Sequence, residues 1–140
     1  MTETHSGTYK IWREFINQPN AEKLQTILHD TVKFHSPFIW KPKHGKASAT
    51  AILLAATEVF VDFRYVREIR NDSHWALEFE ATVSEFSLRG VDLIELDANG
   101  KIVDFEVMIR PANALAALGA EMGRRLAEKE FSENQIVKKG

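Results

Sequence analysis

Cysteine is absent from the 140 residues of the chain, and this absence excludes a group of chemistries. A chain without thiols forms no disulfide, no cysteine-ligated zinc site, no iron–sulfur cluster and no cysteine nucleophile. Proteins in a reducing compartment ordinarily contain no disulfides, so we expect a cytoplasmic location.

A strong charge bias and long apolar runs are also missing. The chain has 18 basic and 20 acidic residues, a net charge of −2, so no basic surplus predicts a nucleic-acid partner. The longest uncharged run, residues 47–57, is too short to span a bilayer, and we therefore expect no membrane partner. The first seven residues lack the basic and apolar regions of a signal peptide.

The composition that is present fits one globular domain. Apolar residues make up 44% of the chain and charged residues 27%, which is ordinary for a protein with a single core. We expect one domain over residues 8–131, with a C-terminal helix over 111–131 included. The polar ends, residues 1–7 and 132–140, are predicted to be flexible tails.

Helices are predicted where apolar residues recur at three- and four-residue spacing, and strands where they alternate. The predicted helices cover residues 8–17, 21–29, 48–60 and 111–131. The predicted strands cover residues 31–35, 63–70, 74–83, 86–96 and 101–110. This order indicates an α+β fold, in which helices lie on one face of a curved, mostly antiparallel sheet.

The alternation along the later strands predicts how they pair. A two-residue turn at Ser84-Glu85 places Phe79 opposite Gly90 and Leu77 opposite Asp92. Around the next turn, pairing Leu96 with Lys101 places Asp92 opposite Phe105. These residues then share one apolar face of the sheet with Val107.

Asp92 is the single ionisable residue on this apolar face of the last three strands. A carboxyl there either stays ionised beside a partner or becomes a neutral hydrogen-bond donor through a raised pKa. Both states are useful in a pocket, because perturbed carboxyls cluster at functional sites. The alternative is a structural Asp92 that is bonded to backbone or paired with a helix arginine, such as Arg13 or Arg124.

Three parts of the chain resemble the NTF2-like superfamily, and within it the SnoaL-like proteins. They are the strand end Val32-Lys33-Phe34-His35-Ser36-Pro37, Gly45 before the third helix, and the segment GVDLIELDANGKIV over residues 90–103. The resemblance spans about residues 8–110 and implies a cone-shaped fold around a hydrophobic pocket, with the last helix as an extension. Relatives include polyketide cyclases, ketosteroid isomerase and limonene epoxide hydrolase, and many members are homodimers, so fold alone does not assign function.

The functional residues of these relatives carry over unevenly. Asp92 matches the oxyanion-hole aspartate of ketosteroid isomerases, whereas Trp12 stands at the tyrosine position and Ser36 at the position of the base. The epoxide hydrolase set is absent, because Gly90 and Val107 replace its arginine and second aspartate. Polyketide cyclases of this type use an aspartate and a histidine for acid–base chemistry. This is the mechanism that the sequence contradicts least, because Asp92 and His35 could form such a pair. The resemblance thus implies Asp92, His35 and Trp12 as the catalytic candidates.

Aromatic and apolar side chains near this wall are the candidates for substrate binding, with ordinary core packing as the alternative for each. They are Tyr9, Trp40, Leu77, Phe79, Phe105 and Val107. The five histidines lack the spacing of metal ligands, so we expect no metal and no cofactor. Parity along the first strand points His35 away from the core side that holds Phe34.

The opposite face of the sheet is charged but carries an apolar patch of Val91, Leu93 and Met108, which predicts a symmetric homodimer. Three functions stay open. The first is an isomerase- or cyclase-type enzyme that acts on a small hydrophobic carbonyl compound. The others are a non-catalytic module that binds a small hydrophobic molecule, and a dimeric interaction protein with a filled cavity.

Overall fold

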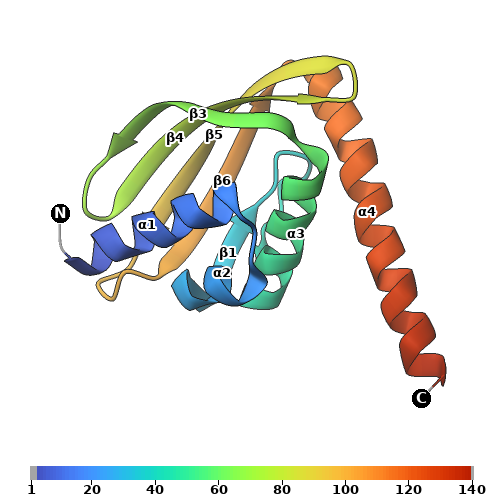
Figure 1. The fold of residues 1–140 in the computed structure, drawn as a ribbon, viewed down its shortest axis with the longest axis horizontal. Coiled ribbons are helices and arrows are strands. Elements are labelled where there is room, and N and C mark those ends of the chain that lie inside the picture. Colours follow the sequence, from blue (N-terminus) through green and yellow to red (C-terminus); the bar gives the residue numbers. More distant parts are fainter. Residues whose placement is uncertain (1–2, 140) are drawn as a thin grey trace.

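The computed structural model describes residues 3–139, and the side chains of residues 5–128. Four helices and six strands follow one another along the chain, as the ribbon shows (Figure 1). Their order and bounds are α1 Glu3–Asn17, α2 Ala21–Ile27, β1 Leu28–His35, β2 Lys43–His44, α3 Lys46–Val59, β3 Val61–Arg70, β4 His74–Val83, β5 Phe86–Leu96, β6 Ile102–Arg110 and α4 Ala112–Lys139.

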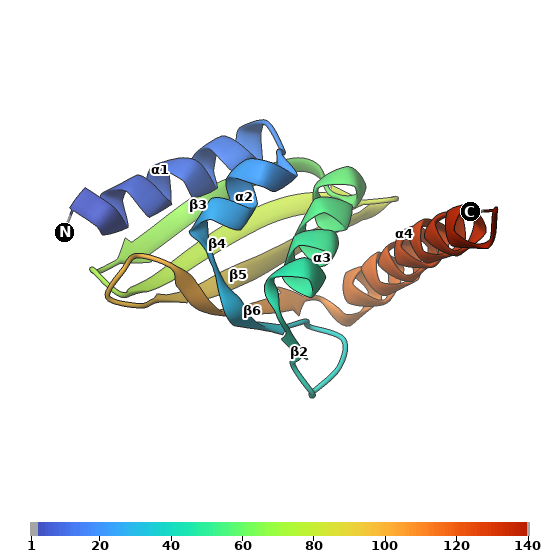
Figure 2. The same cartoon turned by 90° about the horizontal axis from the view of Figure 1, so that it is seen from below.

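The six strands form one curved sheet in the order β2-β1-β6-β5-β4-β3. β1 runs parallel to β6, and every other neighbouring pair is antiparallel. Helices α1, α2 and α3 all cover the same face of this sheet (Figure 2). The predicted α+β architecture, a mostly antiparallel curved sheet around helices with a C-terminal helix added, is confirmed.

The pairing of β4 with β5 is the one predicted from the two-residue turn. Leu77 is opposite Asp92 and Phe79 is opposite Gly90. Along β4, buried residues alternate with half-buried ones, because every second side chain points into the core. The inward set is Trp75, Leu77, Phe79, Ala81 and Val83.

The pairing of β5 with β6 differs from the prediction by two residues, since Asp92 is opposite Val107 and Phe105 is opposite Ile94. The turn accounts for one residue of this shift, because Leu96 is opposite Ile102 rather than Lys101. In this turn the Asp97 carboxylate accepts hydrogen bonds from the backbone N–H groups of Asn99 and Lys101, both at 2.9 Å. An irregularity between Glu95 and Leu96 adds the second residue. Because a shift of two preserves the side-chain alternation, Asp92 still faces the core.

Helix α1 begins at Glu3, five residues before the predicted start. Two side chains near its start are fixed to the β5–β6 turn: His5 Nε2 lies 3.0 Å from the Asp97 carbonyl, and Thr8 donates to the Gly100 carbonyl at 2.5 Å. Helix therefore replaces the predicted N-terminal tail over residues 3–7, and residues 1 and 2 lie outside the described part.

Helix α2 ends two residues earlier than predicted, because the chain becomes extended at Leu28 and enters β1 directly. Leu28 is buried there, and packing of this strand against the core outweighs continuation of the helix. Asn20 caps the start of the helix, since its side-chain Oδ1 atom accepts from the Lys23 N–H at 3.0 Å.

Helix α4 packs against α3 with its first half and extends away from the sheet with its second (Figure 1). Ala114, Leu118 and Met122 are buried, and Arg125 pairs with Glu58 of α3 at 2.9 Å. The helix runs to Lys139, so helix also replaces the predicted tail over residues 132–139. Within residues 3–139, no helix combines the length and apolarity needed to cross a membrane.

Candidate functional site

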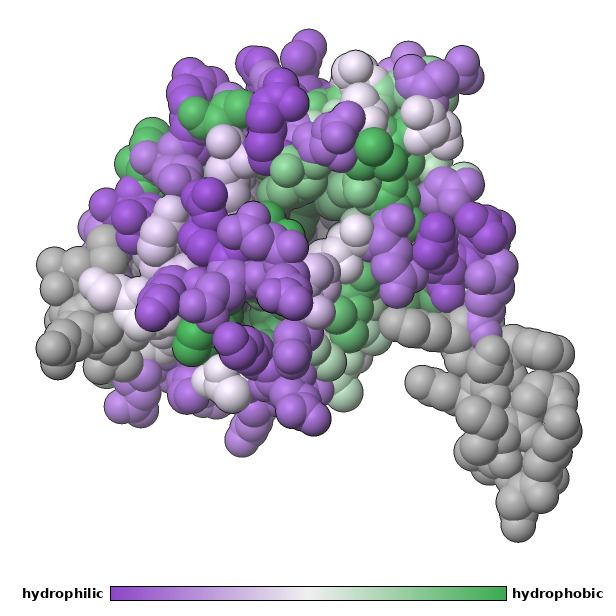
Figure 3. All heavy atoms as spheres, viewed as in Figure 1, coloured by the Kyte–Doolittle hydropathy of each residue, from purple (hydrophilic) through white to green (hydrophobic). Residues whose placement is uncertain are grey.

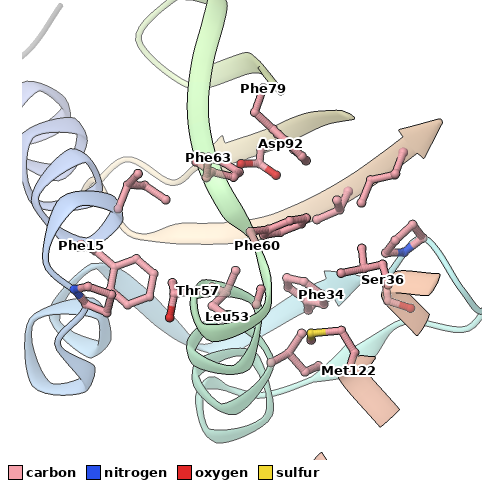
Figure 4. A pocket seen from close by; sticks show the side chains of 18 of the residues that line it. Phe15, Phe34, Ser36, Leu53, Thr57, Phe60, Phe63, Phe79, Asp92 and Met122 are labelled. Carbon is pink, nitrogen blue, oxygen red and sulfur yellow. The ribbon is translucent and has the colours of Figure 1, made fainter. Parts of the chain in front are cut away.

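An apolar cavity of about 300 Å³ lies between the concave face of the sheet and the helices (Figure 4). This volume is at the lower end of the range for small-molecule sites. Its wall is built from α1, β1 and the segment after it, α3, β3 to β6 and α4. In the space-filling view, hydrophobic side chains are visible in a gap between hydrophilic ones (Figure 3). Aromatic rings form much of the wall: Trp12, Phe15, Phe34, Phe38, Phe60, Phe63 and Phe79.

Asp92 is the one ionisable side chain among the described residues that line this cavity. It is 5% exposed, and Tyr65 donates a hydrogen bond of 2.5 Å to its Oδ2 atom. Burial raises the pKa of Asp92 to about 7, although the hydrogen bond from Tyr65 opposes this by favouring the charged form. A carboxyl with this pKa exchanges a proton readily near neutral pH.

Tyr65 connects Asp92 to helix α1. The Trp12 indole N–H donates a hydrogen bond to the Tyr65 hydroxyl oxygen at 3.0 Å, and the Tyr65 hydroxyl in turn donates one to Asp92. Burial raises the pKa of Tyr65 well above its usual value, and the nearby Asp92 charge raises it further. Tyr65 therefore stays protonated as a donor, and the Trp12–Tyr65–Asp92 chain holds the carboxyl in one orientation.

Gly90 explains why the sheet accepts so many rings beside Asp92. A Cβ atom at position 90 would lie 2.4 Å from the Phe79 ring and 2.7 Å from the Met108 carbonyl oxygen. The absent side chain thus makes room for Phe79, which stacks on Phe63 with ring centroids 4.8 Å apart. Phe79 and Phe63 flank Asp92 on the cavity wall (Figure 4).

The structure brings four of the predicted site residues together. Trp12, Phe79 and Val107 line the cavity with Asp92. Leu77 and Phe105 face the same side of the sheet but are buried in the core next to the cavity, where they contribute to packing. The functional roles assigned to these residues stay predictions.

Three other predicted residues lie elsewhere. His35 Nε2 is 3.1 Å from Asp104 Oδ2 on the opposite face of the sheet, as the strand parity indicated, and it is not part of the cavity wall. The Tyr9 hydroxyl donates to Glu68 at 2.8 Å, at the outer edge of α1. Trp40 is 98% exposed, so its ring projects from the loop after β1 rather than into the cavity.

The arginines that could have made Asp92 a structural ion pair have other partners. Arg13 pairs with Glu68 at 2.8 Å, and Arg124 pairs with Glu121 on its own helix at 2.8 Å. Asp92 accordingly has Tyr65 as its hydrogen-bond partner among the described residues.

Tyr65 was not predicted as a site residue. The signal was present in the alternation of β3, because Phe63 and Tyr65 share a face and Tyr65 pairs with Phe79 on β4. An irregularity after Tyr65 interrupts this alternation, so β3 gives no clean pattern in the sequence. Leu118 and Met122 of α4, which were not predicted as site residues either, also line the cavity.

The outer face of the sheet is charged, as predicted, and its charges form ion pairs. Glu80 forms ion pairs with Arg89 across the β4–β5 ladder and with Arg64 on β3, the latter at 2.5 Å. Met108 on this face is 49% exposed. The homodimer inferred from the apolar patch stays a prediction.

Comparison with known families identifies the domain type. Residues 10–105 match the SnoaL-like domain. No curated protein sequence matches the chain.

Solved structures match a larger part of the chain than the family model does. A steroid delta-isomerase from Pseudomonas aeruginosa is 39% identical, with a TM-score of 0.89 over 94% of this chain and 97% of that one. An uncharacterized protein with a cystatin-like fold from Silicibacter pomeroyi is 32% identical, with a TM-score of 0.85 over 94% of both chains. An NTF2-like protein of unknown function from Cytophaga hutchinsonii shares the fold, at 15% identity and a TM-score of 0.60 over 81% of this chain and 96% of that one.

Proposed function

The chain belongs to the SnoaL-like family of the NTF2-like superfamily, and from this premise we propose that it is an acid–base enzyme of the isomerase or cyclase type. Its substrate would be a small hydrophobic compound with a carbonyl group. One observation carries the proposal: Asp92, with a pKa of about 7, is the one ionisable group on the described wall of an apolar cavity.

The chemistry follows from the state of this carboxyl. The ionised form accepts a proton from the carbon next to the substrate carbonyl, and the electron pair of that C–H bond moves toward the carbonyl oxygen. Protonated Asp92 then returns the proton to another carbon, so the double bond moves and no atom is gained or lost. One group serves both steps because near pH 7 its two forms are comparably populated.

Trp12 and Tyr65 act as positioning residues in this proposal. Each of the two donates its hydrogen bond within the chain that ends at Asp92, so the carboxyl is oriented before a substrate enters. The surrounding rings exclude water and fit an apolar substrate body. His35 is left out of the mechanism, since its ring pairs with Asp104. The named steroid isomerase among the similar structures supports an isomerase over other acid–base enzymes.

A second candidate is a binding module for the same class of compound. The observation that favours it is the absence of a second ionisable group among the described cavity residues: Ser36 precedes Pro37 on the wall and is no general base. In this function Asp92 orients the ligand by a hydrogen bond and transfers no proton.

The test uses β,γ-unsaturated cyclic ketones of graded size, whose isomerisation to conjugated ketones is followed by ultraviolet absorbance. We expect turnover by the unmodified protein and a loss of about 100-fold or more in Asp92→Asn. Asp104→Asn is the matched control, because this carboxylate lies on the outer face, and it should retain full activity. Unchanged turnover in Asp92→Asn would refute the enzyme, and thermal stabilisation by the ketones without turnover would favour the binding module.

A further inference from the structure

The segment between β1 and β2 places large apolar side chains in solvent. It protrudes from the edge of the sheet (Figure 2), and Phe38, Ile39 and Trp40 are 40%, 50% and 98% exposed. A fully exposed indole gains nothing from the hydrophobic effect within the fold. Ile39, Trp40 and Met108 line one shallow hollow, so their apolar surfaces are continuous. Exposed apolar patches of this kind mark sites of protein or membrane contact.

The charges along this part of the chain are of one sign, although Glu106 of β6 lines the same hollow as Trp40. No acidic residue occurs between Asp30 and Glu58, whereas Lys33, Lys41, Lys43 and Lys46 fall within that stretch. Lys46 pairs with Asp30 at 3.1 Å, and Lys33 lies in register with Asp104 of β6 at the base of the segment. Lys41 and Lys43 are exposed next to Trp40 and form no ion pair with a described residue. Although the net charge of the chain is −2, Lys41 and Lys43 make the tip of this segment locally basic, and we call them the basic tip.

We propose that residues 38–43 dock on an anionic lipid surface, with Ile39 and Trp40 entering the interface and Lys41 and Lys43 contacting lipid phosphates. An indole ring suits the boundary between headgroups and acyl chains, because it has an apolar body and one N–H donor. Lysines beside it add attraction to the negative surface potential. Docking of this kind needs no membrane-spanning segment. It goes beyond the proposed function and does not depend on catalysis.

The base of the same segment connects it to the cavity. Phe38 lines the cavity and is also 40% exposed, so it lies at an opening. Its ring rests against α4, 3.3 Å from where a Cβ atom of Gly119 would be. Docking through Ile39 and Trp40 would hold this opening at the membrane surface, where apolar compounds concentrate.

Tryptophan fluorescence tests the proposal, because Trp12 and Trp75 are 1% and 2% exposed and Trp40 is the exposed one. The full chain is mixed with phosphatidylcholine vesicles, with or without phosphatidylglycerol. We expect an emission blue-shift and co-sedimentation with the phosphatidylglycerol vesicles, both reversed by high salt. Trp40→Ala should remove the fluorescence change and lower the amount of protein bound, while its melting temperature stays unchanged.

Charge variants separate the basic tip from the overall charge. Lys41→Glu combined with Lys43→Glu should lower the partition coefficient by about tenfold or more, whereas the exposed Lys10→Glu on α1 should change it little. Equal binding by the double variant, or no blue-shift with phosphatidylglycerol vesicles, would overturn the proposal. A blue-shift that grows with protein concentration in the absence of vesicles would overturn it as well, because a second copy of the chain would then cover Trp40.

Discussion

Asp92 is a residue whose burial lowers the stability of the fold as the pH rises above about 4. Its usual pKa of 3.8 applies to the unfolded chain, while burial raises the pKa to about 7 in the fold. Between these values the folded protein keeps a proton that the unfolded chain has released, so stability falls as pH rises from about 4 to about 7. The difference corresponds to at most about 4 kcal/mol.

Asp92→Asn removes this titration and keeps an oxygen that accepts from Tyr65. We expect the variant to exceed the unmodified protein in unfolding free energy at about pH 8, by up to about 4 kcal/mol, and to match it near pH 4. Urea denaturation at a series of pH values measures the difference. The exposed Glu85→Gln serves as the control and should stay within about 0.5 kcal/mol at each pH. A pH-independent difference between Asp92→Asn and the unmodified protein would contradict the raised pKa.

Tyr65 opposes the effect of burial on the Asp92 pKa, and a second substitution isolates this contribution. Tyr65→Phe deletes the hydrogen bond to the ionised carboxyl, so the pKa of Asp92 should rise further. The measurement is the carboxyl resonance of labelled aspartate in a pH titration. Tyr9→Phe is the matched control, because that hydroxyl bonds Glu68 outside the cavity. An unmoved Asp92 titration in Tyr65→Phe would show that the bond does not tune the acid.

The sequence pattern identified Asp92 but not its hydrogen-bond partner Tyr65, because the two residues lie on strands of different regularity. Asp92 stands out because its strand alternates strictly and its neighbours on that face are apolar. Tyr65 lies on an irregular strand, where the face of each side chain depends on a shift in pairing that the sequence does not reveal. His35 and Trp40 have residue types suited to a site, yet their positions at a strand end and in a loop leave their direction to tertiary packing.

At the scale of elements, the hairpins show which pairings a sequence determines. The β4–β5 register follows from a two-residue turn and a strict alternation, and it was predicted residue by residue. The β5–β6 register depends on how Asp97 folds its own loop through two side-chain hydrogen bonds, and on an irregularity between Glu95 and Leu96. Such local bonding alters loop length without altering which residues are apolar, so the faces were predicted and the offset was not.

Two glycines should respond in opposite ways to replacement by alanine, because one is needed for close packing and the other only lowers helix propensity. Gly90→Ala would force a Cβ atom to within 2.4 Å of the Phe79 ring, and the carbonyl of Met108 leaves no room on the other side. We expect a loss of about 1–3 kcal/mol. In Gly123→Ala the added Cβ atom meets nothing within 4 Å at an exposed position of helix α4, so the variant should gain about 0.5–1 kcal/mol. Thermal and urea denaturation of both variants provides the check, and equal effects would contradict the packing role of Gly90.

For the molecule as a whole, properties such as net charge do not describe the local surface at residues 38–43. The sequence indicated no membrane partner because no segment is long enough to span a bilayer, and the net charge of −2 indicated no nucleic-acid partner. Residues 38–43 form no such long segment, yet they combine an exposed indole with two lysines that form no ion pair with a described residue. Net charge and span length describe the chain as a sum, whereas docking depends on which few side chains the fold leaves outside.

Helix α4 completes the cavity although the SnoaL-like match ends at residue 105. Leu118 and Met122 close the wall beside Phe38, and both are buried. In this chain, residues beyond the family match thus supply one side of the cavity. The side chains of α4 should therefore limit the size of the ligand that fits.

Met122→Ala tests this role of α4 in the whole molecule. Removal of the side chain enlarges the cavity and costs about 2 kcal/mol of stability, the low end for a buried methionine, because one side of Met122 already faces the cavity. In the graded ketone series, binding should shift toward larger members, as measured by thermal shift or calorimetry. Met108→Ala, a half-exposed methionine on the outer face, should leave stability within about 0.5 kcal/mol and the size preference unchanged. If Met122→Ala lowers stability but keeps the same size preference, α4 supports the cavity without setting what enters it.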